Sequence, residues 1–422
     1  METFTHRGRN PYLYLLPVSF LSTGISAFLT FPRSMRLFDI GVGVAIYGVL
    51  LSLSSLVSLV MNAFIGRLVD RYGCLSAVLK ALLAVSIVSH FFYIFSDDMV
   101  LLSILLVLET AASKVFVVFI SQVISGIAPA SYGRGLGYYK LAGSVAWAIC
   151  ASVSGYVTSY FGFSSLMTVV FVMAVAKMVL LTRLLLIYDS RTKDTRTRHT
   201  CDVPVRDILS ASMVNALVLY MIMQLQSNGG FSYLQIYLST VLGLDEIESG
   251  HILAASGIFE ILIAALVGRI CDVGRNGMKT MVVVGSVLSA IRWLVLGNVY
   301  IGFAGLLFTQ FLHGVMICTI NIAFIDYFRA LTRDEGFGTA IGLAGALSSL
   351  CTMAGSWLFG LVGDGFGLSS AYRWLGLLGL LSVAAFLVVD VIVRPAPSRC
   401  RMTHAFAFES ANTRKFEKED SK

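Results

Sequence analysis

The sequence predicts an all-α membrane protein with twelve transmembrane helices in two six-helix halves. Hydrophobic residues make up 57% of the 422 residues and charged residues only 13%, with a mean hydropathy of +0.82. A water-soluble domain needs more charged surface than this, so a soluble fold is excluded. Apolar runs of about 20 residues, enough to cross a hydrocarbon layer of about 30 Å, recur along the chain.

Breaks of Gly, Pro, Asp and Arg separate these apolar runs, and such residues interrupt spanning helices. The expected helices are 11–32, 42–66, 76–96, 99–127, 136–160, 164–187, 208–230, 248–270, 280–299, 301–327, 338–362 and 372–393. An even number of crossings places both termini on the same side of the membrane.

Positive charge predicts which side that is, because loops kept in the cytoplasm carry the excess of Lys and Arg. Basic loops alternate along the chain, and the densest cluster lies at 189–207. The opposite loops carry acids such as Asp97, Asp98 and Asp245. We therefore expect a multi-pass protein of the bacterial inner membrane, surrounded by lipid, with both termini cytoplasmic. This topology explains the net charge of +7 without a nucleic-acid partner.

A repeated motif relates the two halves. The sequence GRLVD at 66–70 recurs as GRICD at 268–272, and LAG at 141–143 recurs at 343–345 with the same offset. A shared offset indicates a structural repeat, and an even number of helices gives both copies the same orientation in the membrane. The expected units are the six-helix half 1–188, the cytoplasmic linker 189–207, the six-helix half 208–395 and the cytoplasmic tail 396–422.

The segment GRLVDRYG at 66–73 resembles the motif that follows the second helix in the major facilitator superfamily. The resemblance implies a cytoplasmic gate that rearranges as the halves move, formed by Gly66, Asp70, Arg71, Gly73 and the repeat residue Asp272. Cys74 and Leu75 replace basic residues of the family motif. A role in setting topology alone is the alternative for the arginines.

Further segments resemble the lactose permease, phenylpropionate permease and sugar efflux branch of this superfamily. These are KLAGSVAW at 140–147, AIRW at 290–293 and FLHG at 311–314. The resemblance implies that Lys140 and Trp147 bind substrate, and that Arg292 and His313 belong to a proton-coupling network. Met316 stands where lactose permease has its proton-carrying glutamate.

Ionisable side chains inside spanning helices are costly, so they usually face the bundle interior and serve function. The set here is Glu109, Lys114, Lys140, Glu260, Arg292 and His313. Glu260 is the expected proton carrier and Arg292 its counter-ion or that of a substrate anion; His313 is a relay or a simple hydrogen-bonding residue. Glu109 and Lys114 point about 140° apart on a helix, so each needs a partner elsewhere. We assign Glu109 to proton coupling and Lys114 to substrate binding.

A polar stripe on the seventh helix is formed by Tyr220, Gln224 and Asn228, which recur every fourth residue. These neutral donors and acceptors suit hydroxyl and amide groups of a substrate. Cavity lining is the preferred interpretation, and hydrogen bonding between helices is the alternative.

Together these patterns predict a proton-coupled secondary active transporter for a saccharide or similar small polar metabolite, working by alternating access as a monomer. A proton-driven exporter of a sugar or siderophore-like metabolite is the alternative. No nucleotide-binding GxxxxGK[ST] motif is present, and the seven cysteines have no paired CxxC spacing, so no cofactor or metal is expected. A membrane enzyme or a sensor would need a catalytic constellation or a signalling domain, which the sequence lacks.

Overall fold

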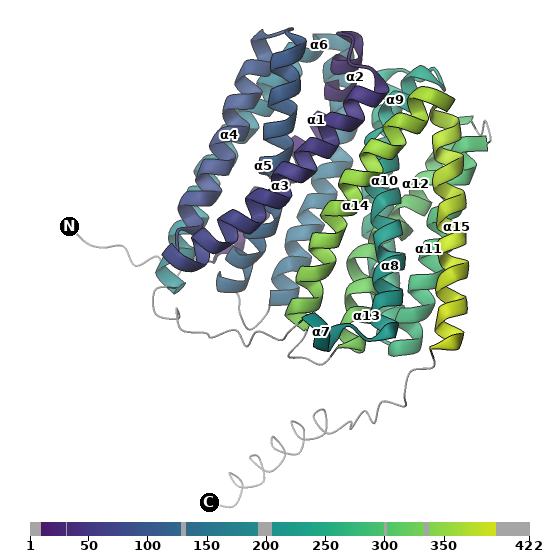
Figure 1. The fold of residues 1–422 in the computed structure, drawn as a ribbon. Coiled ribbons are helices and arrows are strands. Elements are labelled where there is room, and N and C mark those ends of the chain that lie inside the picture. The colour runs from purple at the N-terminus through teal and green to yellow at the C-terminus, as the bar shows by residue number, and fades with distance from the viewer. Residues whose placement is uncertain are drawn as a thin grey trace, which may run out of the picture.

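The computed structural model describes residues 10–30, 32–127, 132–192, 205–298, 302–332 and 337–393. Among these residues the secondary structure is entirely helical, and most helices run side by side through one bundle (Figure 1). Most of the predicted linker, at 193–204, and the predicted tail at 396–422 lie outside the described residues.

The first half contains six crossings. Its helices are α1 (Tyr12–Thr30), α2 (Pro32–Asp39), α3 (Val44–Tyr72), α4 (Leu75–Phe95), α5 (Met99–Ile127) and α6 (Tyr132–Thr192). Helices α1 and α2 form the first crossing. The long α6 provides the fifth and sixth crossings, because Gly162 breaks it with a φ of 79°, a conformation that glycine adopts readily.

The second half repeats this order after the short α7 (Val205–Ile208). Its helices are α8 (Ala211–Leu225), η3 (Gln226–Gly230), α9 (Leu234–Thr240), α10 (Glu246–Cys271), α11 (Arg275–Asn298), α12 (Gly302–Cys318), η4 (Thr319–Ala323), α13 (Phe324–Leu331), α14 (Phe337–Phe366) and α15 (Leu368–Ile392). The π-helices η3 and η4 interrupt the seventh and tenth crossings. Such π-helical turns occur frequently at functional sites.

The predicted twelve-helix fold is confirmed. Ten described segments are long and apolar enough to span a membrane, and one of them is the double crossing of α6. The seventh crossing is not among these ten segments because η3 divides it into α8 and α9, and each of these helices is too short to span a membrane alone. Two helix ends differ most from the prediction. The seventh crossing continues through α9 to Thr240 instead of ending at 230. At the motif 66–73, α3 continues to Tyr72 and is capped by Gly73 with a φ of 60°. The repeated motif at 268–272 likewise lies on the last turn of α10.

The bundle has two ends that differ in charge. We call the end with the α3–α4 and α10–α11 turns, which carry Arg71 and Arg269, the basic end. The acidic end carries Asp97, Asp98 and Asp245 in the α4–α5 and α9–α10 turns. The two halves contact one another mainly through α3 with α14 and through α6 with α10.

The halves approach most closely near the acidic end, where glycines replace side chains. A Cβ added at Gly48 would lie 2.7 Å from the Ser356 carbonyl oxygen, and one at Gly250 would lie 2.9 Å from the Ala151 carbonyl oxygen. A Cβ at Gly155 would lie 3.0 Å from Ile247 Cα. Close backbone contact of this kind is how helices associate in lipid.

Near the basic end, matching glycines face open space. Gly137 and Gly268 lie about five helical turns from Gly155 and Gly250 respectively, so each faces the same way as its counterpart. A Cβ added at Gly137, Gly268 or Gly342 would meet nothing within 4 Å. The two halves are therefore packed together at the acidic end and separated along these faces at the basic end.

Candidate functional site

Trp147 joins the two halves near the middle of the bundle. Its indole nitrogen donates hydrogen bonds across the interface to the Leu253 carbonyl oxygen and the Ser256 hydroxyl, both at 3.1 Å. Gly257 permits this approach, since a Cβ there would lie 3.1 Å from the Trp147 ring. The Trp147 ring is half-buried and lies 6.0 Å from the ring of Phe231.

Lys140 and Glu260 face one another across the same interface. Lys140 lies two turns before Trp147 on the same face of α6, and its side chain is exposed. Its ammonium interacts electrostatically with the Glu260 carboxylate on α10, which also faces the Ser144 hydroxyl. A cation on the first half and a carboxylate on the second thus lie on opposite sides of this interface, close enough for their charges to interact, although no ion pair joins them among the described residues.

Arg292 lies away from Glu260, in the interior of the second half. Its side chain is fully buried, its Nε donates to the Thr309 carbonyl oxygen at 3.1 Å, and its guanidinium lies 4.0 Å from the Trp293 ring. No ion pair joins it to Glu260 among the described residues. In this conformation the structure therefore places the two predicted partners apart.

His313 of α12 lies near Arg292 of α11. The guanidinium charge acts on the buried His313 ring, and this ring stacks on Phe231 with centroids 4.7 Å apart. A line of rings thus runs from Trp147 at the interface through Phe231 to His313. This line connects the interface between the halves with the buried arginine.

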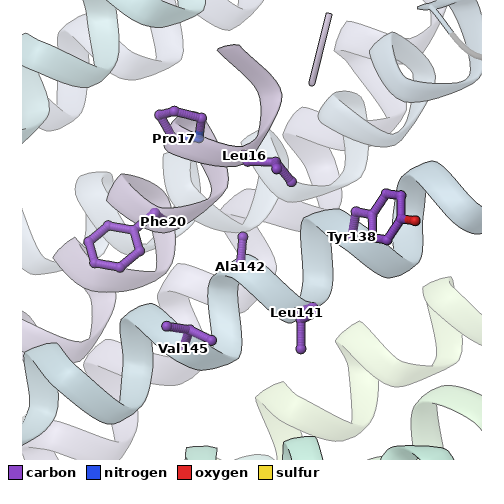
Figure 2. A pocket seen from close by; sticks show the side chains of 7 residues that line it. All are labelled: Leu16, Pro17, Phe20, Tyr138, Leu141, Ala142 and Val145. Atoms are coloured by element: carbon purple, nitrogen blue, oxygen red, sulfur yellow. The ribbon is translucent and has the colours of Figure 1, made fainter. Parts of the chain in front are cut away.

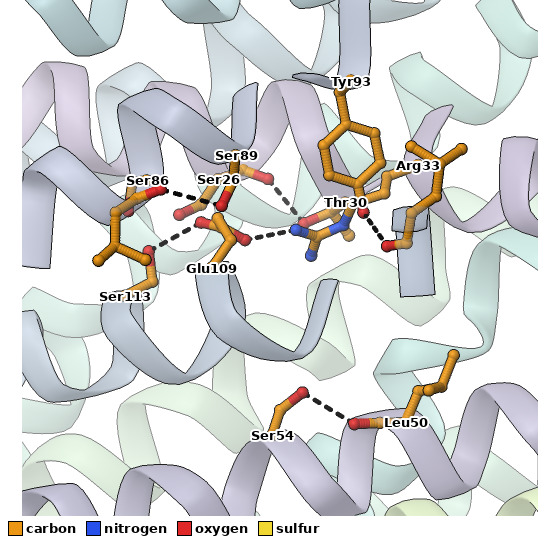
Figure 3. A network of polar contacts seen from close by, with 12 residues as sticks. Ser26, Thr30, Arg33, Leu50, Ser54, Ser86, Ser89, Tyr93, Glu109 and Ser113 are labelled. Atoms are coloured by element: carbon orange, nitrogen blue, oxygen red, sulfur yellow. Dashed lines mark hydrogen bonds and ion pairs between the residues drawn. The ribbon is translucent and has the colours of Figure 1, made fainter. Parts of the chain in front are cut away.

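Glu109 has a partner on another helix, as its position on α5 predicted. Its carboxylate accepts a hydrogen bond from Arg33 of α2 and another from the Ser113 hydroxyl at 3.1 Å (Figure 3). The Glu109 side chain is buried, with 4% of its surface exposed. Arg33 is 12% exposed, so this ion pair between α2 and α5 is largely removed from solvent.

Sequence reasoning missed two buried groups close to this ion pair. The ammonium of Lys177 lies 4.0 Å over the Phe116 ring, and its charge interacts with Glu109. His90 is 1% exposed, and neither ring nitrogen has a hydrogen-bond partner. Both residues lie within predicted spanning segments, so the rule that selected the other intramembrane charges would also have selected them.

Lys114, the other charged residue predicted on this helix, also finds a partner. Its ammonium donates to the Ser55 hydroxyl of α3 at 2.7 Å. The side chain is only partly buried, and it points away from Glu109 as the helical geometry requires. Lys114 therefore lies between α5 and α3, one of the helices that contact the second half.

The polar stripe on the seventh crossing bonds within itself. Gln224 donates to the Tyr220 hydroxyl at 2.6 Å, and Asn228 donates to the side-chain oxygen of Gln224 at 3.2 Å. The buried ring of Tyr220 packs edge-on against Phe324 of α13. Tyr220 thus contributes to helix packing, whereas Gln224 and Asn228 remain partly exposed.

The predicted gate residues lie at the basic end. The Arg71 guanidinium stacks over the Tyr72 ring at 5.4 Å, and Asp272 caps the C-terminus of α10. Gly66 lies in α3, and the side chain of Asp70 lies outside the described part of the structure. Asp272 and Asp326 of α13 are close enough to interact, which brings two carboxylates together at this end.

An apolar pocket of about 430 Å³ lies between α1 and α6 (Figure 2). Its lining residues are Leu16, Pro17, Phe20, Tyr138, Leu141, Ala142 and Val145. The α6 members lie on the helix face opposite to Lys140 and Trp147. This pocket therefore faces away from the polar groups at the interface, and we assign it to the apolar outer surface of the bundle.

Comparisons with known proteins agree with this arrangement. A family model described as Major Facilitator Superfamily matches residues 15–329, whereas no curated protein matches the chain. A mutant of the nucleoside transporter NupG is similar in structure, with a TM-score of 0.74 and 14% identity, over 90% of this chain and all of that one.

Two further solved structures share the fold. A POT family transporter in complex with 5-aminolevulinic acid matches with a TM-score of 0.70 and 12% identity, over 90% of this chain and 96% of that one. A bacterial homologue of the human lysosomal transporter Spinster matches with a TM-score of 0.68 and 12% identity, over 91% of this chain and 98% of that one. At these identities the similarity establishes the fold.

Proposed function

Because this chain belongs to the Major Facilitator Superfamily, we propose that it is a proton-coupled secondary active transporter of a small polar solute. The observation that carries the proposal is the unequal contact between the halves. Glycine-mediated contacts close the acidic end, and the same helix faces are separated at the basic end. Alternating access requires this kind of arrangement, in which two halves rock around a site between them.

The solute site is proposed at the interface between the halves, on the side open to the basic end. Lys140 supplies charged hydrogen-bond donors and Trp147 an aromatic face, and the two lie on the same face of α6. Lys114, Gln224 and Asn228 supply further polar groups, with Tyr220 holding the stripe in place. This mixture of donors, acceptors and rings suits a saccharide or a similar polar metabolite.

Proton coupling is proposed to centre on Glu260. Its partner in this conformation is Lys140 of the other half, so protonation would weaken an attraction across the interface. Arg292 then acts as a second charged group within the same half, His313 beside it acts as a relay, and Glu109 is the alternative carrier. The ion pair of Glu109 with Arg33 makes Glu109 the less accessible of the two carboxylates.

The proposed orientation places the basic end in the cytoplasm of a bacterial cell, with the protein in the inner membrane as a monomer. Arg71, Arg206 and Arg269 support this assignment, because basic residues concentrate on the cytoplasmic side. The described conformation is then open to the cytoplasm. Cysteines introduced at Tyr72 and at Asp98 test the orientation: a membrane-impermeant maleimide added to intact cells should label only the second.

The experiment that tests transport is counterflow in proteoliposomes. Vesicles preloaded with unlabelled sugars, nucleosides or aromatic acids are diluted into the matching labelled solute, and transient accumulation is measured. At least one solute should accumulate in vesicles that contain the protein. Vesicles carrying a variant with Gly137→Trp and Gly342→Trp serve as a control, because bulky groups on the open faces should block closure of the basic end. Absence of counterflow for every class would contradict the proposal.

A further inference from the structure

Arg292 and its neighbours form a cluster of buried polar groups without partners. Arg292 is 0% exposed, and both terminal nitrogens of its guanidinium lack a hydrogen-bond partner. Nearby in the chain and the fold, Trp293 Nε1, His313 Nδ1 and the Gln310 side-chain oxygen are also buried and unpartnered. Unpaired polar groups are rare in protein interiors, and a buried charge without a counter-ion is the most costly kind.

We propose that this cluster is a subsite for a carboxylate carried by the transported solute. The proposal rests on the function proposed above and narrows its substrate class to small polar acids. The two free nitrogens of a guanidinium match the two oxygens of a carboxylate, and arginine is the residue best suited to this paired recognition.

The balance of donors and acceptors in the cluster favours an anion. Three of its five unpartnered atoms, the two nitrogens of Arg292 and the indole nitrogen of Trp293, can only donate. The Gln310 oxygen can only accept, and His313 Nδ1 donates or accepts according to its tautomer. A carboxylate supplies the acceptors that this set of groups lacks.

The described residues do not supply this negative charge themselves. Glu260 faces Lys140 and Ser144, and Glu109 is paired with Arg33 in the other half. Met316 lies one turn after His313 on α12 and carries no charge. An acid on the solute is therefore the remaining partner that can enter from the interface between the halves.

The seventh crossing provides a route from the interface to the cluster. Phe231 covers His313 and follows directly after η3, whose Gly230 packs so closely on Trp293 that an added Cβ would lie 2.5 Å from the ring. The Tyr372 hydroxyl donates to the Gly230 carbonyl oxygen at 2.9 Å. Movement of this π-helical turn, with loss of its contacts to Trp293 and Tyr372, would expose the guanidinium to the interface between the halves.

The test measures binding by matched acid and neutral probes to the full chain in lipid nanodiscs. The probes are glucuronate with glucose, and 3-phenylpropionate with 3-phenylpropanol, read out by the shift in unfolding temperature over a concentration series. The acid of at least one pair should bind the unmodified protein at least about tenfold more tightly than its neutral partner, the effect of one charged hydrogen-bonding pair. Chloride alone should not reproduce the shift.

Variants then assign the preference to the arginine. Arg292→Gln should remove the tenfold preference and leave binding of the neutral probe within about twofold, while Arg292→Lys should keep part of it because the charge remains. Arg373→Gln is the matched control: it also removes one arginine charge, but from an exposed position on α15. This control should retain the full preference.

Three results would overturn the subsite. One is an acid preference that survives Arg292→Gln, another is equal stabilisation by chloride, and the third is the absence of any acid binding. Loss of proton-driven transport of a neutral solute, with acid selectivity unchanged, would instead make Arg292 the counter-ion of a protein carboxylate. Counterflow of neutral solutes without acid binding refutes the subsite alone, whereas acid binding without counterflow refutes the transport function.

Discussion

Among the described residues, Arg33 in the first half is largely buried and Arg292 in the second half is fully buried, and their surroundings differ. Arg33 meets the Glu109 carboxylate, which accepts a further hydrogen bond from Ser113. Arg292 meets a single backbone carbonyl oxygen and an aromatic face, and its two terminal nitrogens have no partner. The first arginine is satisfied within the fold, whereas the second has binding capacity left over. This unused capacity is the reason for proposing a solute-binding role for Arg292 and a structural role for Arg33.

The largest effect is expected from breaking the satisfied pair. Glu109→Ala leaves Arg33 buried without a counter-ion, which should cost about 3–5 kcal/mol of stability. Chemical unfolding in mixed lipid–detergent micelles measures this loss. The double variant Arg33→Met with Glu109→Leu should recover most of the stability, because neither charge remains buried. A single variant as stable as the parent would show that the pair contributes little.

Glu260 extends the comparison to the carboxylates, because its partner belongs to the other half. Glu260→Gln imitates the protonated state permanently. It should lower the accumulation of solute against its gradient at least about tenfold, while exchange of solute across the membrane continues. Uptake in proteoliposomes with and without a pH gradient measures the accumulation, and counterflow measures the exchange. Uphill transport with intact proton uptake would move the proton site to His313 or Glu109.

Removal of Arg292 should change the stability of the protein in the opposite direction to removal of Glu109. Arg292→Met takes away an uncompensated buried charge and keeps an unbranched chain against Trp293, so stability should be unchanged or about 1–2 kcal/mol higher. The same unfolding assay measures it. A loss of more than about 2 kcal/mol would mean that the arginine is already neutralised within the protein, and the contrast with Arg33 would disappear.

The smallest effect is expected at Lys177, beside the satisfied pair. Lys177→Met removes a charge that interacts with Glu109 but preserves packing on the Phe116 ring through the thioether. The expected change in unfolding free energy is within about 1 kcal/mol. Arg33→Met in the same assay provides the scale for a direct partner of Glu109. Equal effects of the two changes would show that the carboxylate is shared between both cations.

The sequence predicted the twelve crossings correctly, and for two intramembrane charges it predicted the need for a partner but not which residue that partner is. Glu109 and Lys114 were each expected to need a partner on another helix, and helical geometry alone was enough for that inference. The choice of Arg33 and Ser55 could not be predicted, because these residues come from separate helices far along the chain. Lys177 and His90 were overlooked although the cost of intramembrane polarity marks both of them.

The number of helices and the repeat of the halves were determined by the sequence itself. Lipid offers no hydrogen-bond partners, so each long apolar run must form a helix whatever surrounds it. The tertiary structure alone decided that Glu260 lies within reach of the Lys140 charge, that Arg292 has no carboxylate partner among the described residues and that the acidic end is closed. These features depend on how helices far apart in the chain pack against one another, which the pattern of apolar residues along each helix does not specify.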